Sequence, residues 1–327
     1  MLYIDALQSS NWDREILEEI RKGGIDAVHV TCALWESARD TLTTLGRWHR
    51  RIRENSDIVL LASKAADIKH AAETGRTAVV LGLQGSSPIE DELDLVEVFY
   101  LLGVRFMQLT YNNQSLIGGS CYEEHDSGLS RFGRQVIAQM NRVGMLVDLS
   151  HVGERTSLEA ISISDRPVTI THSNPLSSFM HARNKSDPVL KELAANGGVL
   201  GCTIYPPLIG GNNVTLMSWI EIVARTVDLI GVEHVGIGTD ASRKWEDHHL
   251  QWVRLGRWAH DPSLGRTVSG SDSWPIWPAW FQTPADFPNI VDGLRKYGFS
   301  EPEMAAILGG NWMRIFSNGF GPQIAGA

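Results

Sequence analysis

The chain has 327 residues, of which 43% are hydrophobic and 20% charged, and its 29 Lys and Arg against 38 Asp and Glu leave a net charge of −9. This acidic balance argues against nucleic-acid binding, which needs a basic patch for the phosphates. No stretch approaches the roughly 18 consecutive apolar residues of a membrane span, and the N-terminal residues lack the basic and apolar regions of a signal peptide. Three scattered cysteines match no disulfide framework. We therefore expect a soluble, cytoplasmic protein.

Eight short apolar segments, rich in β-branched residues, are expected to form strands. They cover residues 3–6, 27–31, 78–83, 106–110, 146–149, 168–171, 199–203 and 235–238. Buried parallel strands have nearly continuous apolar runs, and the segments TAVVLGL and GVLGCTI have this pattern. The sequence therefore predicts strands that are covered on both faces.

Segments with helical periodicity separate these strands, at residues 13–22, 41–55, 89–102, 130–143, 155–162, 188–196 and 217–230. Several end at a glycine in the position of a C-terminal cap, for example Gly103, Gly144 and Gly231. Repeated alternation of strand and helix predicts an α/β fold, a (β/α)8 barrel of the TIM type, rather than two doubly wound halves. We expect residues 1–327 to form one domain, because no linker or repeat divides them.

Residues 241–287 do not follow this alternation. The segment is aperiodic and proline-rich, and it contains six of the eleven tryptophans of the chain: Trp245, Trp252, Trp258, Trp274, Trp277 and Trp280. A segment of this length without regular structure is usually functional. We expect an excursion on the loop after the eighth strand, followed by two closing helices at 289–297 and 302–308.

Three candidate metal ligands follow three different strands. His151, His172 and Asp240 come at the ends of the fifth, sixth and eighth predicted strands, and barrels of this kind carry their catalytic residues at the carboxyl ends of the strands. A catalytic zinc commonly has three such ligands and a water, whose pKa the ion lowers so that it becomes a hydrolytic nucleophile. The alternative is that each histidine is a hydrogen-bonded core residue.

Other polar residues near the same strand ends are weaker candidates. Arg183 is a candidate for bidentate binding of a substrate carboxylate, and the alternative is a salt bridge with Asp187. Asp148 is a candidate for orienting a ligand histidine, although capping of the local backbone is the better interpretation.

Several ordered motifs resemble the renal (membrane) dipeptidase family of zinc hydrolases. They are GVRFMQLTYNN, GLSRFGRQVIAQMNRVGMLVDLSHV, THSNPLSSFMHARNKSD, GGVLG, EHVGIGTD and GGNWMRIF. The resemblance runs with few gaps from about residue 79 to residue 238 and resumes near residue 301. It implies a (β/α)8 barrel with two zinc ions that cleaves dipeptides, often with a D-residue on the C-terminal side. It also implies a homodimer, which is common in the family.

The resemblance assigns roles to individual residues as well. His151 and His172 match the two histidines of the family's second zinc. Asp240 matches the aspartate that handles the nucleophilic water or protonates the leaving amine. Arg183 matches the arginine that receives the carboxylate of the substrate.

Four positions depart from the family pattern. Leu7 and Ser9 stand where the family has a histidine and an aspartate for the first zinc, and Gln84 replaces the glutamate that bridges both ions. Tyr111 stands in place of a histidine that contacts the substrate, so we expect Tyr111 and Gln84 to be substrate-binding residues. The loss of two anionic ligands leaves the charge of one dication uncompensated. We therefore predict that the first zinc site is empty and that one zinc ion binds at the second.

Two functions of different classes remain open. The first is metal-dependent hydrolysis of a small dipeptide or related amide with a free carboxylate, using one zinc ion. The second is a family member that has lost dipeptidase activity and binds a small carboxylate or a methylated amine, which the joint departures at positions 7, 9 and 84 favour. Clustered tryptophans near Asp240 suit a cation–π site for a methylated amine, but a hydrophobic plug or subunit contact is the better interpretation.

Overall fold

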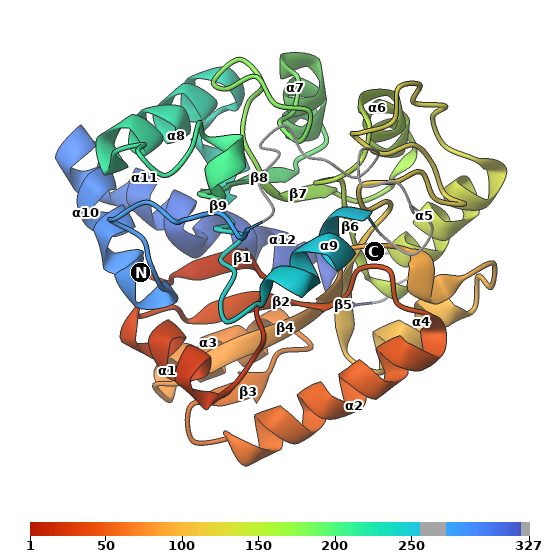
Figure 1. Ribbon diagram of the computed structural model, residues 1–327, viewed down its shortest axis with the longest axis horizontal. Helices are drawn as coiled ribbons and strands as arrows, with labels where there is room; N and C mark the ends of the chain where they lie inside the picture. Colours follow the sequence, from red (N-terminus) through yellow and green to blue (C-terminus); the bar gives the residue numbers. More distant parts are fainter. Residues whose placement is uncertain (256–272, 322–327) are drawn as a thin grey trace.

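The computed structural model describes residues 1–255 and 273–321 (Figure 1). Its described strands form one parallel sheet in the order β1-β2-β4-β5-β6-β7-β8-β9, with β3 off this path. The strands are β1 (Ile4–Gln8), β2 (Ala27–Ala33), β3 (Val59–Leu61), β4 (Thr77–Leu83), β5 (Val104–Gln108), β6 (Leu146–Asp148), β7 (Thr169–Ser173), β8 (Val199–Cys202) and β9 (Val235–Ile237). The eight predicted strands correspond to β1, β2 and β4 to β9.

The sheet closes on itself between β1 and β9 through backbone contacts just beyond their ends. Gln8 forms a parallel bridge with Ala241, and the Ser9 N–H donates to the Ala241 carbonyl at 3.0 Å. The Asp240 N–H donates to the Leu7 carbonyl, also at 3.0 Å. The predicted (β/α)8 barrel is therefore confirmed.

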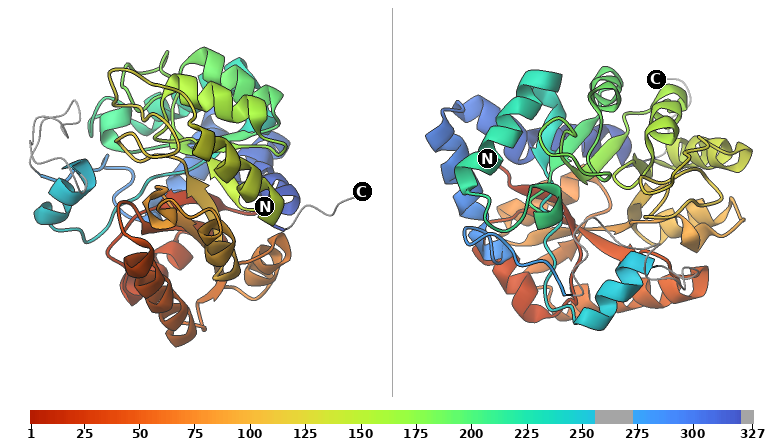
Figure 2. Two further views of the ribbon diagram at one scale, coloured as in Figure 1. Left: turned by 90° about the vertical axis from the view of Figure 1, so that its right-hand side faces the viewer. Right: turned by 45° about the horizontal axis from the view of Figure 1, so that its top comes forward.

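Helices surround the ring of strands (Figure 1). They are α1 (Arg14–Lys22), α2 (Ala38–Glu54), α3 (Ala65–Glu73), α4 (Leu95–Leu101), α5 (Arg131–Val143), α6 (Glu154–Ile163), α7 (Asp187–Ala195), α8 (Leu216–Ile230), α10 (Phe287–Tyr297) and α11 (Glu301–Ala305). Two further helices, α9 (Asp247–Leu255) and α12 (Asn311–Gly319), lie at opposite ends of the barrel (Figure 2). Helix α12 contains most of the GGNWMRIF motif. It closes the end of the barrel away from α9, since Trp312 and Phe316 pack with Ile4 and Phe106 of the barrel.

Local sequence signals explain where the helices begin and end. The Asp13 side chain accepts from the Ile16 N–H at the start of α1, and the Ser130 side chain accepts from the Gly133 N–H at the start of α5. Helix α5 ends at Gly144, whose φ of +87° is in the left-handed region that only glycine adopts at little cost.

Three predicted details differ from the structure. Strand β3 and helix α3 were not predicted, because β3 has three residues and only pairs with the first residues of β4. The predicted helix at 89–102 is shorter, since a single 3-10 turn at Ser87–Ile89 precedes α4. The excursion contains a helix, α9, where none was predicted, while Trp258 lies outside the described residues.

The imidazole of His29 lies in the barrel interior, in close contact with the neighbouring strands β1 and β4. The His29 ring of β2 is buried, donates from Nδ1 to the Ala6 carbonyl at 2.7 Å and stacks on Phe106 with centroids 4.4 Å apart. A Cβ on Gly82 of β4 would lie 1.9 Å from His29 Nε2. Gly82 is therefore required for the imidazole to fit.

Gly82→Ala is expected to lower the free energy of unfolding by about 1–3 kcal/mol, because the added methyl group would overlap the buried His29 ring and overpack the interior. The measurement is denaturant unfolding. Gly46→Ala in α2 is the matched control, since a Cβ there has no neighbour within 4 Å; it is expected to raise stability by about 0.5–1 kcal/mol. Equal stabilities of the two variants would contradict this account of the interior.

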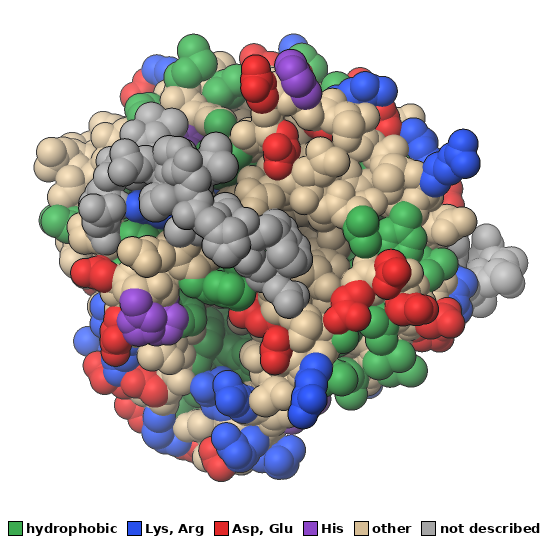
Figure 3. Space-filling model, turned by 45° about the vertical axis from the view of Figure 1, so that its right-hand side comes forward, with side chains coloured by type: hydrophobic (Ala, Val, Ile, Leu, Met, Phe, Trp, Pro, Cys, Tyr) green, Lys and Arg blue, Asp and Glu red, His purple; other side chains and the backbone are tan. Residues whose placement is uncertain are grey.

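None of the helices in residues 1–255 and 273–321 is long and apolar enough to cross a membrane. On the face shown in Figure 3, Asp and Glu side chains are interspersed with Lys and Arg side chains.

Candidate active site

The structure brings together the two histidines predicted as metal ligands. His172 lies in β7 and His151 three residues after β6, and their Nε2 atoms are 3.1 Å apart. The Nδ1 atom of His151 lies 2.7 Å from Asn112 Oδ1, and that of His172 lies 2.8 Å from Thr171 Oγ1. Both rings are buried, so each imidazole is fixed at one nitrogen and faces the other histidine with its second.

These hydrogen-bond partners determine where the ring protons are. Asn112 Oδ1 only accepts, so His151 Nδ1 carries the proton. Thr171 Oγ1 donates its own hydrogen to Asp148 Oδ2 at 2.7 Å, so it accepts from His172 Nδ1. Both Nε2 atoms are then unprotonated and point lone pairs at each other, an arrangement that a cation between them stabilises.

The histidine pair fits two ligands of a divalent ion. Two nitrogens each about 2.0–2.1 Å from a tetrahedral ion are about 3.3–3.4 Å apart, close to the observed separation. Burial, and then the charge of Arg183, hold the pKa of both rings well below the usual range, so both stay neutral. Within residues 1–255 and 273–321, no group of three His, Cys, Asp or Glu side chains is placed to hold an ion. Asp240 as third ligand therefore stays a prediction.

Asp148 at the end of β6 organises the loop that carries His151. Its Oδ1 accepts from the Ser150 N–H at 3.1 Å, the Ser150 hydroxyl at 2.7 Å and the Thr171 N–H at 3.0 Å. Its Oδ2 accepts from the Thr171 hydroxyl that binds His172. Asp148 thus has both roles that the sequence left open: it caps the backbone and orients a histidine.

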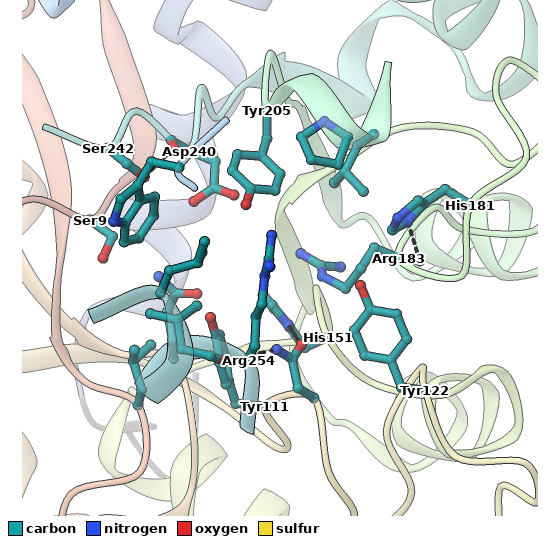
Figure 4. Close-up of a pocket in the computed structure, with 18 residues that line it drawn as sticks. Ser9, Tyr111, Tyr122, His151, His181, Arg183, Tyr205, Asp240, Ser242 and Arg254 are labelled. Atoms are coloured by element: carbon teal, nitrogen blue, oxygen red, sulfur yellow. Dashed lines mark hydrogen bonds between the residues drawn. The ribbon is translucent and has the colours of Figure 1, made fainter. Parts of the chain in front are cut away.

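Asp240 follows β9 on the opposite side of the pocket from His151 (Figure 4). Its φ of +59° is unusual for a residue other than glycine, and such strained positions cluster at functional sites. The pKa of Asp240 is raised to about 7, chiefly by burial, while the charge of Arg183 lowers it and the Asp5 carboxyl raises it. A carboxyl group with this pKa takes up and releases a proton near neutral pH, as acid–base catalysis requires.

Asp5, which sequence analysis missed, positions the strand end that carries Asp240. One oxygen accepts from the Thr239 N–H at 2.8 Å, and the other accepts from the Thr239 hydroxyl at 2.6 Å and from Gln8 Nε2 at 2.8 Å. Asp5, the second residue of β1, therefore holds Thr239, the residue before Asp240, as Asp148 holds Thr171, the residue before His172.

Arg183 is a buried cation whose hydrogen bonds go to backbone carbonyls. Its Nη1 donates to the Ser150 carbonyl and its Nη2 to the His172 carbonyl at 3.3 Å. The alternative of a salt bridge with Asp187 is wrong, because Asp187 accepts from the Ser177 hydroxyl and no ion pair joins it to Arg183 in the described chain. A buried guanidinium without an acidic partner is suited to bind an anion.

His151, Arg183 and Asp240 line a pocket of about 660 Å³, partly open to solvent, at the end of the barrel that α9 covers, whereas the fully buried His172 is not part of its lining. Figure 4 shows the Arg183 and Arg254 side chains in its middle, with Asp240 and Tyr205 on one side and His151 and Tyr111 on the other. The wall also contains residues that sequence analysis did not single out for a role: Asn112, Tyr122, His181, Tyr205, Ser242 and Arg254.

The described tryptophans of the excursion do not form one cage. Trp274 lines the pocket and lies 6.3 Å from Trp245, with ring planes 15° apart. Trp280 packs on Trp219 at 5.6 Å and donates from Nε1 to the Val214 carbonyl, and Trp277 packs on Phe281. The packing of Trp277 and Trp280 fits the interpretation of these tryptophans as a hydrophobic plug.

The family model of the membrane dipeptidases (peptidase family M19) matches residues 7–248 of this chain. The chain belongs to the membrane dipeptidase family. Among curated proteins, the dipeptidase verJ of Clonostachys rogersoniana is 30% identical over 335 residues, which cover 96% of this chain and 79% of that protein. The predicted resemblance and the class of hydrolase are confirmed.

Solved structures agree with this membership of the membrane dipeptidases. An amidohydrolase from Pseudomonas aeruginosa is 37% identical with a TM-score of 0.91, over 98% of this chain and 96% of that one. A metallopeptidase from Rhodobacter sphaeroides, solved with a phosphinate mimic of the dipeptide L-Ala-D-Ala, has a TM-score of 0.80 at 16% identity, over 98% of this chain and 99% of that one. The second likeness concerns the fold alone.

The positions that depart from the membrane dipeptidase pattern lie at the same end of the barrel. Ser9, Gln84 and Tyr111 line the pocket, whereas Leu7 is fully buried. Gln84 Nε2 donates to the Thr31 hydroxyl at 2.6 Å, so its amide is held by a protein partner. The Tyr111 ring stacks on His151 with centroids 4.2 Å apart. Neutral side chains thus occupy this part of the wall.

Proposed function

We propose that this protein is an amidohydrolase that cleaves a small dipeptide or a related amide with a free carboxylate, using one zinc ion held by His151 and His172. The observation that carries the proposal is the 3.1 Å approach of the two Nε2 atoms, with each Nδ1 bonded to an oriented oxygen. Membership of the membrane dipeptidase family supports the class of substrate.

The proposal of one ion rather than two rests on the side chains around the pocket. Leu7 offers no ligand atom, Ser9 is neutral, and Gln84 already donates to Thr31. The described lining has two guanidinium groups, Arg183 and Arg254, and a single carboxylate, Asp240. A second dication would add charge where compensating anions are few.

The residues of this chain divide the chemistry between them. When bound, the ion polarises the scissile carbonyl and lowers the pKa of a water molecule. Arg183 binds the substrate carboxylate through the N–H groups that do not reach Ser150 or His172, and Tyr111 and Gln84 position the substrate. Asp240 accepts a proton from the attacking water and delivers it to the leaving amine, which its pKa of about 7 permits.

A second candidate is a protein that has lost hydrolysis and binds a small carboxylate. The observation that favours it is the set of neutral residues at positions 7, 9 and 84. The two arginines in the middle of the pocket favour an anionic ligand over a methylated amine. The homodimer that the resemblance implies is part of our proposal as well, and light scattering of the native protein tests it.

The test compares chelated protein with the same protein after Zn²⁺ is added back, on a panel of L,L- and L,D-dipeptides. We expect one zinc ion per chain by elemental analysis, and hydrolysis that chelation removes and zinc restores. Absence of both zinc binding and zinc-dependent hydrolysis would overturn the proposal. Undiminished tight binding of small carboxylates by the chelated, inactive protein would establish the second candidate instead.

A further inference from the structure

A second cavity, of about 970 Å³, adjoins the active-site pocket. Ser9, Leu34 and Val253 line both spaces, so the two share part of their walls. One wall comes from α2 and the other from α9. Helix α9 is held in place because Trp35 Nε1 donates to the Trp252 carbonyl at 3.0 Å and Asn112 Nδ2 donates to the Val253 carbonyl at 3.3 Å.

The walls of this cavity are rich in indole rings. Trp12, Trp48, Trp245 and Trp252 all line it. Trp12 and Trp48 contact each other edge to face, with centroids 5.2 Å apart. Flat aromatic walls of this kind favour a planar apolar guest.

Two polar atoms of the lining are buried and have no hydrogen-bond partner among residues 1–255 and 273–321. They are Trp12 Nε1 and His249 Nδ1, and the Trp12 side chain is only 8% exposed. An indole N–H buried without an acceptor costs free energy that a ligand oxygen would recover. The Trp12 indole N–H can only donate, so an oxygen of a ligand that accepts from it would satisfy it.

The charged groups of the cavity favour an anion. Arg47 and Arg51 lie four residues apart on α2, on the same face of the helix, and neither forms an ion pair within the described residues. Arg51 Nη2 donates to the Trp12 carbonyl at 2.9 Å and lies over the Trp48 ring. The acidic residue of the lining, Glu36, is engaged by the Leu34 and Trp35 N–H groups. His249 adds no negative charge.

We propose that this cavity binds an aromatic carboxylate, as the distal part of a substrate whose scissile amide lies in the adjoining pocket. The ring lies among the indoles, and the carboxylate accepts from Trp12 Nε1 and faces Arg47 and Arg51. The extension of the substrate into this cavity rests on the proposed function, whereas binding of an aromatic carboxylate in this cavity does not. The substrate is then larger than a minimal dipeptide.

The first experiment is calorimetric titration of the full-length protein with indole-3-acetate and with its neutral analogue indole-3-acetamide. We expect saturable binding of the acid and at least about tenfold weaker binding of the amide, since a hydrogen bond to a charged group is stronger than one to a neutral group. Trp12→Phe keeps a ring and removes the N–H, so it is expected to weaken binding by about tenfold.

Arginine variants on α2 locate the bound acid. Arg47 is exposed, and Arg47→Met is expected to weaken binding by about threefold at low salt. Arg50→Met is the matched control, because Arg50 does not line the cavity and lies 4.0 Å from Glu54. Absence of saturable binding, or equal affinity in the wild type, Trp12→Phe and Arg47→Met, would overturn the site. Because binding is read without turnover, this result is independent of the hydrolysis assay.

The second experiment tests the extension of the substrate. Two amides that differ only in a distal indole carboxylate are compared in the zinc-loaded enzyme. We expect a lower KM for the amide that carries it, and Trp12→Phe is expected to raise that KM with little change in kcat. Equal KM values for the two amides would overturn the shared substrate and leave the cavity as the site of a separate effector.

Discussion

Asp240→Asn is expected to lower kcat by about 10²–10⁴-fold, because the amide cannot exchange the proton that the carboxyl group exchanges. KM is expected to change little, since the carboxylate of the substrate binds at Arg183. The measurement is steady-state hydrolysis by the zinc-loaded enzyme. A variant with nearly wild-type kcat would exclude Asp240 as the acid–base group.

The pH dependence follows from the same residue. The raised pKa of about 7 means that Asp240 is protonated in acid and ionised in alkali. As a base it acts when ionised, so kcat/KM of the wild type is expected to rise with pH through about 7 and level off above it. For Asp240→Asn, kcat/KM is expected to be independent of pH over this range. If kcat/KM of the variant rose with pH as in the wild type, the titrating group would be a residue other than Asp240.

Stability is expected to change in the opposite direction from activity. In metal-free protein between pH 4 and 7, the folded state keeps a proton on Asp240 that the unfolded chain releases, so stability falls as pH rises through this range. Asp240→Asn has no charge to bury, and it is expected to be more stable than the wild type by about 1–3 kcal/mol above pH 7 and similar below pH 4. Urea unfolding at two pH values measures the difference.

His172→Ala is expected to have the second large effect. It removes one of the two ring nitrogens that converge at 3.1 Å, so bound zinc should fall from one ion per chain to a trace and activity by about 10³-fold or more. Asn112→Ala keeps both rings but removes the partner of His151 Nδ1, and it is expected to weaken zinc binding by about 10–100-fold.

The matched control for His172→Ala is His70→Ala, because His70 lies on the surface at the end of α3. It is expected to keep both the zinc content and the activity. Full zinc content in His172→Ala would place the ion elsewhere and remove His151 as its partner.

The sequence predicted the barrel because its strands are continuous apolar runs separated by amphipathic helices. Segments such as 78–83 and 199–203 carry their signal in their own residues. Strand β3 and helix α9 have only a weak signal. Strand β3 has three residues, and Leu250 is the one buried side chain among residues 247–254 of α9, so neither has a strong periodic pattern. Their positions depend on what they pack against.

Site residues could be proposed from the sequence where they lie at the end of a predicted strand. His151, His172 and Asp240 come directly at strand ends, and the barrel brings the two histidines into contact. Tyr122 and His181 belong to long loops, and Arg254 to a helix in an apparently aperiodic segment. The sequence shows such residues but not where their loops fold. Asp5 was missed because its role depends on Thr239, 234 residues away.

The closure of the barrel has a consequence for how its chemistry can change. Main-chain atoms of residues 7, 8, 9, 240 and 241 join β1 to β9 at the seam, beside the side-chain bonds between Asp5 and Thr239. The main-chain atoms are the same whatever side chain the residue bears. Side chains at positions 7 and 9 can therefore change between polar and apolar without removing these main-chain bonds. The same property makes this edge a place where catalytic groups can be grafted or deleted one at a time, with the scaffold left intact.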